Sequence, residues 1–186
     1  YGEPMRDLFS IGITGTNGKT TVSTLCHQIF QSAGQETGLI GTVETRIGTE
    51  VLSSTRTTPE ATELQSLVAT MRERHCRNLV MEVSSHAISL ERVRGSYFAA
   101  VGFTNLSQYH LDFHGSMDEY FAAKSKLFTF EYADHAFINI DDSYGQILAA
   151  STELPVQTLS RFNENATWHY TRIEEGIHHS DISIRG

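Results

Sequence analysis

The feature that most constrains this fold is a glycine-rich turn close to the start of the chain. Its sequence is Thr14-Gly15-Thr16-Asn17-Gly18-Lys19-Thr20-Thr21. The apolar run Leu8–Ile13 precedes it and predicts a buried strand, and residues 19–33 predict a helix closed by Gly34. A glycine turn that joins a strand to a helix presents backbone N–H groups to an anion. The turn therefore predicts an α/β domain that binds the phosphates of a nucleoside triphosphate.

Different residues of this turn suit different parts of a metal–triphosphate complex. Gly15 and Gly18 let the backbone approach a phosphate with no Cβ between them. Lys19 is placed to reach the β- and γ-phosphates, and the Thr20 hydroxyl to bind Mg²⁺. Ile13 stands where the strict phosphate-loop pattern has its first glycine, so an ordinary glycine turn with a capping threonine is the alternative. The predicted nucleotide site comprises Gly15, Thr16, Asn17, Gly18, Lys19, Thr20 and Thr21.

Predicted strands and helices alternate along the rest of the chain. We expect a hairpin of residues 39–47 and 51–55 around Gly48, a helix from Pro59 to Arg74, strands at 78–83, 97–104 and 136–140, a helix at 117–130 with Ser116 as its N-cap, and a short helix from Tyr144. The tail alternates polar and apolar residues around Glu175-Gly176 and predicts an antiparallel hairpin. This order predicts a mostly parallel P-loop NTPase-like sheet with helices on both faces, plus a small antiparallel edge hairpin. Ligands of such sheets gather at the carboxyl ends of the strands.

Composition narrows the class of protein. A chain of 186 residues fits one domain, and its formal net charge of −8 argues against a nucleic-acid binder, which would carry a basic surface. No apolar run approaches the roughly 20 residues of a membrane span. Cys26 and Cys76 lie far apart and are expected to be free thiols, which fits the cytoplasm. Because the chain begins at Tyr1 rather than Met, we expect a fragment of a longer protein.

Three further segments carry side chains that could bind a metal. Glu82 closes a predicted strand beside the phosphate loop and is a candidate Mg²⁺ ligand, the alternative being an acid that only faces solvent. His110 and His114 have the spacing of one helix face, but two histidines without a nearby glutamate or cysteine pair make a weak zinc motif. By pattern alone, Lys124 and Lys126 are exposed lysines of a helix.

Five motifs together resemble the Mur ligase family. They are the glycine turn, Thr57-Thr58-Pro59-Glu60, Glu82-Val83-Ser84-Ser85-His86, Phe103-Thr104-Asn105-Leu106-Ser107 and Ala123-Lys124. Their order and spacing are most similar to the MurE type, which adds a diamino acid as the third residue of the peptidoglycan stem peptide. The resemblance implies an ATP-dependent ligase of cell-wall biogenesis, on which cell shape and cell division depend. The alternatives are another amide ligase of the superfamily, such as a cyanophycin or folylpolyglutamate synthase, and a nucleotide-binding module without catalysis.

The resemblance also implies roles for individual residues. ATP would bind at Gly15–Thr21, and its γ-phosphate would pass to a carboxylate of the acceptor UDP-MurNAc-L-Ala-D-Glu, giving an acyl phosphate that a diamino acid attacks. The implied catalytic residues are Lys19, His110 and Lys124. The implied metal ligands are Thr20, Glu82, His110 and Lys124, the last as a carbamylated lysine. The implied acceptor-binding residues are Thr57, Thr58, Ser84 and Arg92.

The resemblance further implies how much of the enzyme this chain holds. Residues 1–186 would be the central ATPase domain, incomplete at its C-terminus, of a monomeric cytoplasmic enzyme. The N-terminal UDP-binding domain and the C-terminal amino-acid-binding domain would lie outside the chain, so we expect little activity from the chain alone. Three positions depart from the family: Tyr109 replaces an acidic residue, Leu90 a glutamine found in some members, and Arg56 an asparagine.

Overall fold

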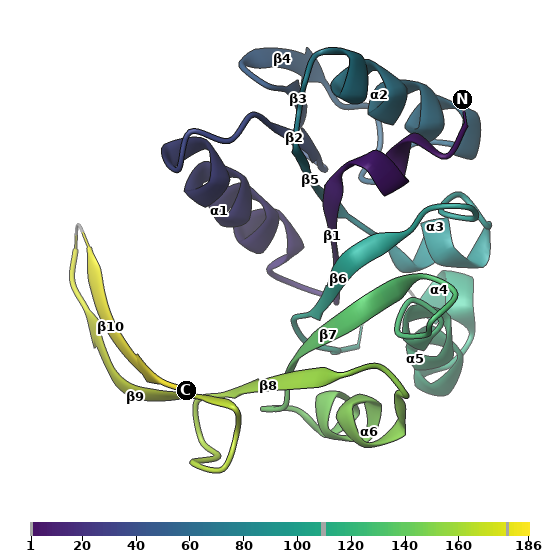
Figure 1. The fold of residues 1–186 in the computed structure, drawn as a ribbon. Coiled ribbons are helices and arrows are strands. Elements are labelled where there is room, and N and C mark those ends of the chain that lie inside the picture. Colours follow the sequence, from purple (N-terminus) through teal and green to yellow (C-terminus); the bar gives the residue numbers. More distant parts are fainter. Residues whose placement is uncertain (1, 109–110, 178) are drawn as a thin grey trace.

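A computed structural model describes residues 2–108, 111–177 and 179–186, and its core is one twisted sheet (Figure 1). Its strands are β1 (Phe9–Thr14), β2 (Thr37–Ile40), β3 (Glu44–Ile47), β4 (Glu50–Ser53), β5 (Asn78–Glu82), β6 (Phe98–Phe103), β7 (Ala133–Asn139), β8 (Val156–Ser160), β9 (Trp168–Glu175) and β10 (Ser180–Arg185). Its helices are η1 (Pro4–Asp7), α1 (Lys19–Ser32), α2 (Ala61–Glu73), α3 (Ser85–Ser89), α4 (Leu111–His114), α5 (Met117–Ser125) and α6 (Ser143–Ser151).

The strand order explains why distant motifs meet. The sheet runs β10-β9-β8-β7-β6-β1-β5-β2-β3-β4. All neighbours from β2 to β9 in this order pair in parallel, whereas β3, β4 and β10 join antiparallel. Strand β1 lies between β5 and β6, so the loops that follow these three strands share one edge of the sheet. The phosphate loop, Glu82 and residues 104–107 therefore become neighbours.

Helices cover both faces of the sheet, and the predicted fold class is confirmed. Figure 1 shows α1 on one side and α2, α3, α5 and α6 on the other. On its face α1 packs Val22, Cys26 and Phe30 against Ile13, Leu39 and Val80. The opposite face holds the larger core, to which the buried stripe of α2 contributes Leu64, Val68 and Met71. The i, i+4, i+7 spacing of these three residues is the helical period that predicted α2.

Several predicted elements are confirmed. The first helix, the α2 helix, the strands at β5, β6 and β7, and the β9–β10 edge hairpin all form within a few residues of their predicted bounds. Ser116 caps α5, since its side chain accepts a hydrogen bond from the Glu119 N–H at 3.2 Å. Cys26 and Cys76 are free thiols. Strand β8 and helix α3 were not predicted: β8 lacks a continuous apolar run, since Gln157 and Thr158 are polar, and α3 is only five residues long.

Two predicted elements are wrong in extent. Residues 39–47 are not one strand: β2 pairs in parallel with β5, the chain turns at residues 41–43, and only β3 forms the hairpin with β4 around Gly48. A Cβ on Gly41 would lie 2.7 Å from Glu82 Oε1, so the turn passes tightly over that carboxylate. The helix expected at 117–130 ends at Ser125, because the chain then turns to bury both Leu127 and Phe128.

Candidate functional site

The phosphate loop is held in an open turn by the segment that follows β6. Gly15 has φ +144° and Gly18 φ +85°, values that favour glycine. The Thr16 N–H donates to Asn105 O at 2.8 Å, and the Asn17 N–H donates to Asn105 Oδ1 at 3.1 Å. Thr104 Oγ1 closes the contact by donating to Asn17 O at 2.7 Å. The Phe103–Ser107 motif therefore positions the loop backbone.

Lys19 lies across the mouth of this loop. It begins α1, and its Nζ donates to Gly15 O at 3.0 Å and to Thr16 O at 2.9 Å. Burial lowers the pKa of the Lys19 ammonium, and the nearby Glu82 carboxylate partly offsets that shift. The Lys19 ammonium thus donates only to neutral carbonyl oxygens. An anion of higher charge would accept these hydrogen bonds more strongly and could replace the carbonyls.

Glu82 is a buried carboxylate, 1% exposed, at the end of β5. Its Oε2 accepts from Thr20 Oγ1 at 3.0 Å and from Thr42 Oγ1 at 3.0 Å, and its Oε1 accepts from the Thr42 N–H at 2.9 Å. The Thr20 hydroxyl therefore lies beside the Glu82 carboxylate, and a metal-binding role for the two stays a prediction. Thr42 was overlooked in the sequence, although it lies two residues beyond β2, where the carboxyl-end rule could have found it.

Lys124 is not an exposed helix lysine, as its pattern alone suggested. It is 1% exposed, and Nζ donates to Gly15 O at 2.9 Å and to Thr14 Oγ1 at 3.4 Å. Its Nζ also lies 4.8 Å from the centre of the Tyr120 ring. Burial, with a smaller contribution from the charge of Lys19, lowers the pKa of Lys124 to about 7. By contrast, Lys126 is exposed, as the pattern predicted.

Of the two histidines, the structure describes His114. His110 and Tyr109 lie outside the described residues. His114 is 7% exposed, and its Nε2 lies 2.9 Å from Ser85 Oγ while its ring packs against Tyr120. Within the described ranges, no group of three or more His, Cys, Asp or Glu side chains could hold a metal. His114 is therefore bound to Ser85 at the start of α3.

The predicted acceptor residues gather where β5 ends. Thr58 Oγ1 donates to Glu82 O at 2.9 Å and accepts from the Ser84 N–H at 3.1 Å. Thr57 Oγ1 lies 3.0 Å from Thr42 Oγ1. Ser84 is the N-cap of α3, since its Oγ accepts from the Ala87 N–H at 3.1 Å. Hydroxyl groups thus connect Thr57, through Thr42, to the Glu82 carboxylate, and Thr58 to the main-chain oxygen of Glu82.

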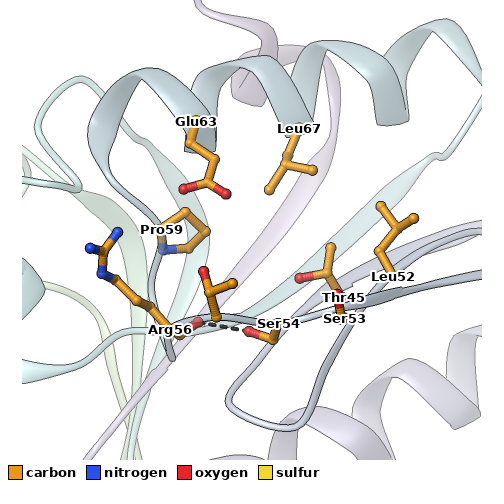
Figure 2. A pocket seen from close by; sticks show the side chains of 9 residues that line it. Thr45, Leu52, Ser53, Ser54, Arg56, Pro59, Glu63 and Leu67 are labelled. Atoms are coloured by element: carbon orange, nitrogen blue, oxygen red, sulfur yellow. Dashed lines mark hydrogen bonds between the residues drawn. The ribbon is translucent and has the colours of Figure 1, made fainter.

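Arg92 lies apart from that network, on the segment that leaves α3. Its Nη2 makes an ion pair with Glu60 Oε1 at 3.0 Å. The loop between β4 and α2, which carries Thr57 and Thr58, also borders a cavity of about 120 Å³ (Figure 2). The cavity is lined by Thr45, Leu52, Ser53, Ser54, Thr55, Arg56, Pro59, Glu63 and Leu67.

The fold and the site agree with one known family. The family described as Mur ligase middle domain matches residues 13–185. The chain belongs to this family. It is 48% identical to the UDP-N-acetylmuramoyl-L-alanyl-D-glutamate--2,6-diaminopimelate ligase of Streptomyces coelicolor, in an alignment that covers 100% of this chain and 37% of the relative. The Aquifex aeolicus protein of the same name is 45% identical over 87% of the chain and 33% of its own length.

Solved structures show the same fold. A structure titled UDP-N-acetylmuramoyl-L-alanyl-D-glutamate--2,6-diaminopimelate ligase superposes with a TM-score of 0.84 at 27% identity, over 95% of this chain and 37% of that one. E. coli FolC in complex with DHPP and ADP superposes with a TM-score of 0.68 at 16% identity, over 96% of this chain and 49% of that one. The Mur ligase middle domain described here thus spans about a third of the length of these curated relatives.

In this Mur ligase middle domain the predicted site residues form two groups. One cluster lies around the carboxyl ends of β1 and β5 and contains the phosphate-loop residues together with Lys19, Thr20, Glu82 and Lys124. Thr57, Thr58 and Ser84 border it, and Arg92 stands beyond α3 with Glu60. No described helix is both long enough and apolar enough to cross a membrane.

Proposed function

We propose that the protein containing this chain is an ATP-dependent ligase of the MurE type. It joins a diamino acid to a carboxylate of UDP-MurNAc-L-Ala-D-Glu in the cytoplasm, as a step of peptidoglycan synthesis. This chain is its central ATP-binding domain, while separate N-terminal and C-terminal domains hold the uridine group and the incoming amino acid. The observation that carries the proposal is the convergence of Lys19, Glu82 and Lys124 on one phosphate loop of a Mur ligase middle domain.

Phosphoryl transfer needs positioned positive charge more than covalent help from the protein. The N-terminus of α1, which begins at Lys19, would face the triphosphate with its unpaired N–H groups. Lys19 exchanges its two loop carbonyls, 2.9 and 3.0 Å away, for β- and γ-phosphate oxygens, a gain because a charge-assisted bond to phosphate is stronger than one to a neutral carbonyl. The acceptor carboxylate then attacks the γ-phosphate, ADP leaves, and the acyl phosphate is consumed by the amine with release of phosphate.

The donor set beside the loop fits Mg²⁺. A hydroxyl and a carboxylate are oxygen ligands, and Mg²⁺ in nucleotide sites uses one or two such groups together with waters and phosphates. Thr20 Oγ1 and Glu82 Oε2, already 3.0 Å apart, would hold the ion, and Thr42 would keep the Glu82 carboxylate oriented through two hydrogen bonds. The ion would neutralise charge on the transferring phosphoryl group.

Lys124 suits conversion to a carbamate. Its amine is buried, and burial lowers its pKa to about 7, so a substantial share of the uncharged form that can attack CO₂ is present near neutral pH. The Nζ lone pair would form the N–C bond with CO₂, and one amine proton would leave to solvent. The product is an anionic oxygen donor beside Gly15, which together with His110 would serve a second metal ion.

The proposal is tested by phosphate release from the full-length protein supplied with ATP, UDP-MurNAc-L-Ala-D-Glu, and diaminopimelate or lysine. We expect release that depends on both the acceptor and the diamino acid. Release only with a different carboxylate acceptor, or none with any, contradicts the MurE assignment. Thr20→Val should lower kcat by about 100-fold, since it removes a proposed metal ligand.

Lysine variants test the carbamate. Lys124→Ala should abolish phosphate release. Depletion of bicarbonate should slow the wild-type enzyme and Lys126→Ala by the same factor. Lys126 is the matched control because it lies two residues away and is exposed. Full activity of Lys124→Ala in bicarbonate-depleted buffer shows that Lys124 has no such role.

A further inference from the structure

The Thr42 side chain joins the candidate metal site to the loop before α2. Its Oγ1 lies 3.0 Å from Glu82 Oε2 and also 3.0 Å from Thr57 Oγ1. Thr42 follows β2, Glu82 ends β5 and Thr57 follows β4, so three separate segments meet at one hydroxyl. Orienting the Glu82 carboxylate requires no contact between Thr42 and Thr57. The second contact of the Thr42 hydroxyl therefore indicates a further role.

The single proton of the Thr42 hydroxyl fixes the direction of these hydrogen bonds. A threonine hydroxyl has one proton and two lone pairs, whereas a carboxylate can only accept. Thr42 Oγ1 therefore donates to Glu82, and Thr57 Oγ1 donates to Thr42. In this arrangement the Thr57 proton points at Thr42 and is not available to a ligand. Hydrogen bonds in such a chain polarise one another, so the strength of the first affects the second.

Occupancy of the metal site would weaken the first bond of this chain. Glu82 Oε2 accepts from both Thr20 and Thr42, and it is the oxygen proposed above to hold Mg²⁺. A bound divalent cation is the largest local charge in such a site and competes for the same lone pairs. Thr42 would then donate less strongly to Glu82, and Thr57 less strongly to Thr42. Thr42 is exposed and Thr57 is half-buried, so a ligand can reach the released Thr57 proton.

We propose that Thr42 is a positioning residue that couples the metal–nucleotide site to acceptor binding. While the metal site is empty, Thr42 holds the Thr57 hydroxyl turned toward Glu82. Once the site is filled, the Thr57 hydroxyl is free to donate to the acceptor. The inference rests on the function proposed above, in which Thr57 contacts the acceptor. The metal-loaded enzyme then binds the acceptor more tightly, and the acceptor tightens metal–nucleotide binding by the same factor, because such coupling is reciprocal.

Equilibrium binding to the full-length protein measures this coupling without turnover. Titration calorimetry gives the Kd of UDP-MurNAc-L-Ala-D-Glu with a non-hydrolysable ATP analogue alone, and then with the analogue plus Mg²⁺. The ratio of the two Kd values is the coupling factor, which we expect to be about tenfold in the wild-type enzyme.

Variants of Thr42 test whether its hydroxyl carries the coupling. Thr42→Val should lower the coupling factor by about threefold or more, because it removes the hydroxyl. The same variant keeps the backbone N–H that donates to Glu82 Oε1 at 2.9 Å. Thr42→Ser keeps the hydroxyl and should keep the wild-type factor. Thr70→Val is the matched control, since the Thr70 hydroxyl also makes a 3.0 Å bond, but only to Ser66 O within α2.

A second variant tests the same chain without changing the contacts of Glu82. Thr57→Val should lower the coupling factor as much as Thr42→Val does, and the double variant should lower it no further, because one chain carries the effect. The loss should persist at high salt, which screens long-range attraction between the metal and the anionic acceptor.

Three results would overturn the inference: a wild-type coupling factor in Thr42→Val, an additional loss in the double variant, or a loss that vanishes at high salt. Absence of acceptor binding by the wild-type enzyme, with or without Mg²⁺, contradicts the proposed function and the inference with it. Wild-type binding with equal coupling in Thr42→Val overturns the inference alone.

Discussion

Replacing Lys124 by methionine tests how strongly the fold disfavours the charged amine. Methionine has a similar length and no charge, so it removes the buried ammonium while filling most of its space. Burial lowers the pKa of Lys124 to about 7 from the ordinary 10.5. Between these two pH values the unfolded chain binds a proton that the folded chain does not. Because the unfolded state binds more protons there, the free energy of unfolding rises with pH in this window and is flat below it.

The size of the effect follows from the two pKa values. From pH 7 to pH 9 the free energy of unfolding should rise by roughly 2 kcal/mol more in the wild-type chain than in Lys124→Met. The variant should be the more stable protein at pH 6, and the gap should narrow as the pH rises. Taking the difference between the two proteins cancels every other titrating group. Lys126→Met, which changes an exposed lysine, should follow the wild-type curve throughout.

Urea unfolding at half-unit steps from pH 6 to pH 9 measures this difference. Far-UV circular dichroism and the fluorescence of Trp168, the single tryptophan, should give coincident transitions. Buffers free of CO₂ keep the lysine as an amine. Parallel curves for the wild-type chain and Lys124→Met between pH 7 and pH 9 would refute the reasoning, since they would mean that the folded state keeps the proton.

Two backbone features give further predictions. Gly15→Ala should destabilise the chain by about 2 kcal/mol or more and weaken ATP binding, because its Cβ would lie 2.0 Å from Thr104 Oγ1 at φ +144°. In urea unfolding, Gly34→Ala is the control, with open space around the Cβ and φ +73°, and should lose only about 1 kcal/mol; equal losses would rule out the clash. Ser116→Ala removes the cap of α5 and should lower the free energy of unfolding by about 1 kcal/mol, and an unchanged urea midpoint would show that the cap contributes nothing.

Much of this fold could be predicted because its signals are local. The phosphate loop can be recognised without knowledge of any other segment. It is defined by a strand, two glycines and a lysine-threonine pair in immediate succession. The apolar period of α2 and the polar cap of α5 likewise depend on neighbours within one or two helical turns. The division of residues 39–47 could not be predicted, because it depends on the Glu82 carboxylate, which lies far away in the sequence.

Within the site, Lys124 is likewise a residue whose surroundings could not be predicted from its local sequence. Its local pattern is that of an exposed helix residue, and only the resemblance to the Mur ligases indicated a role for it. The tertiary structure buries its amine against Gly15, 109 residues earlier in the chain, and so sets its pKa. The sequence by itself determined that the chain has a phosphate loop and a parallel α/β sheet, since short-range periodicity and turn chemistry encode both. Only the tertiary structure decided which side chains surround that loop, because strand order brings β5 and β6 to either side of β1 and desolvation acts through space.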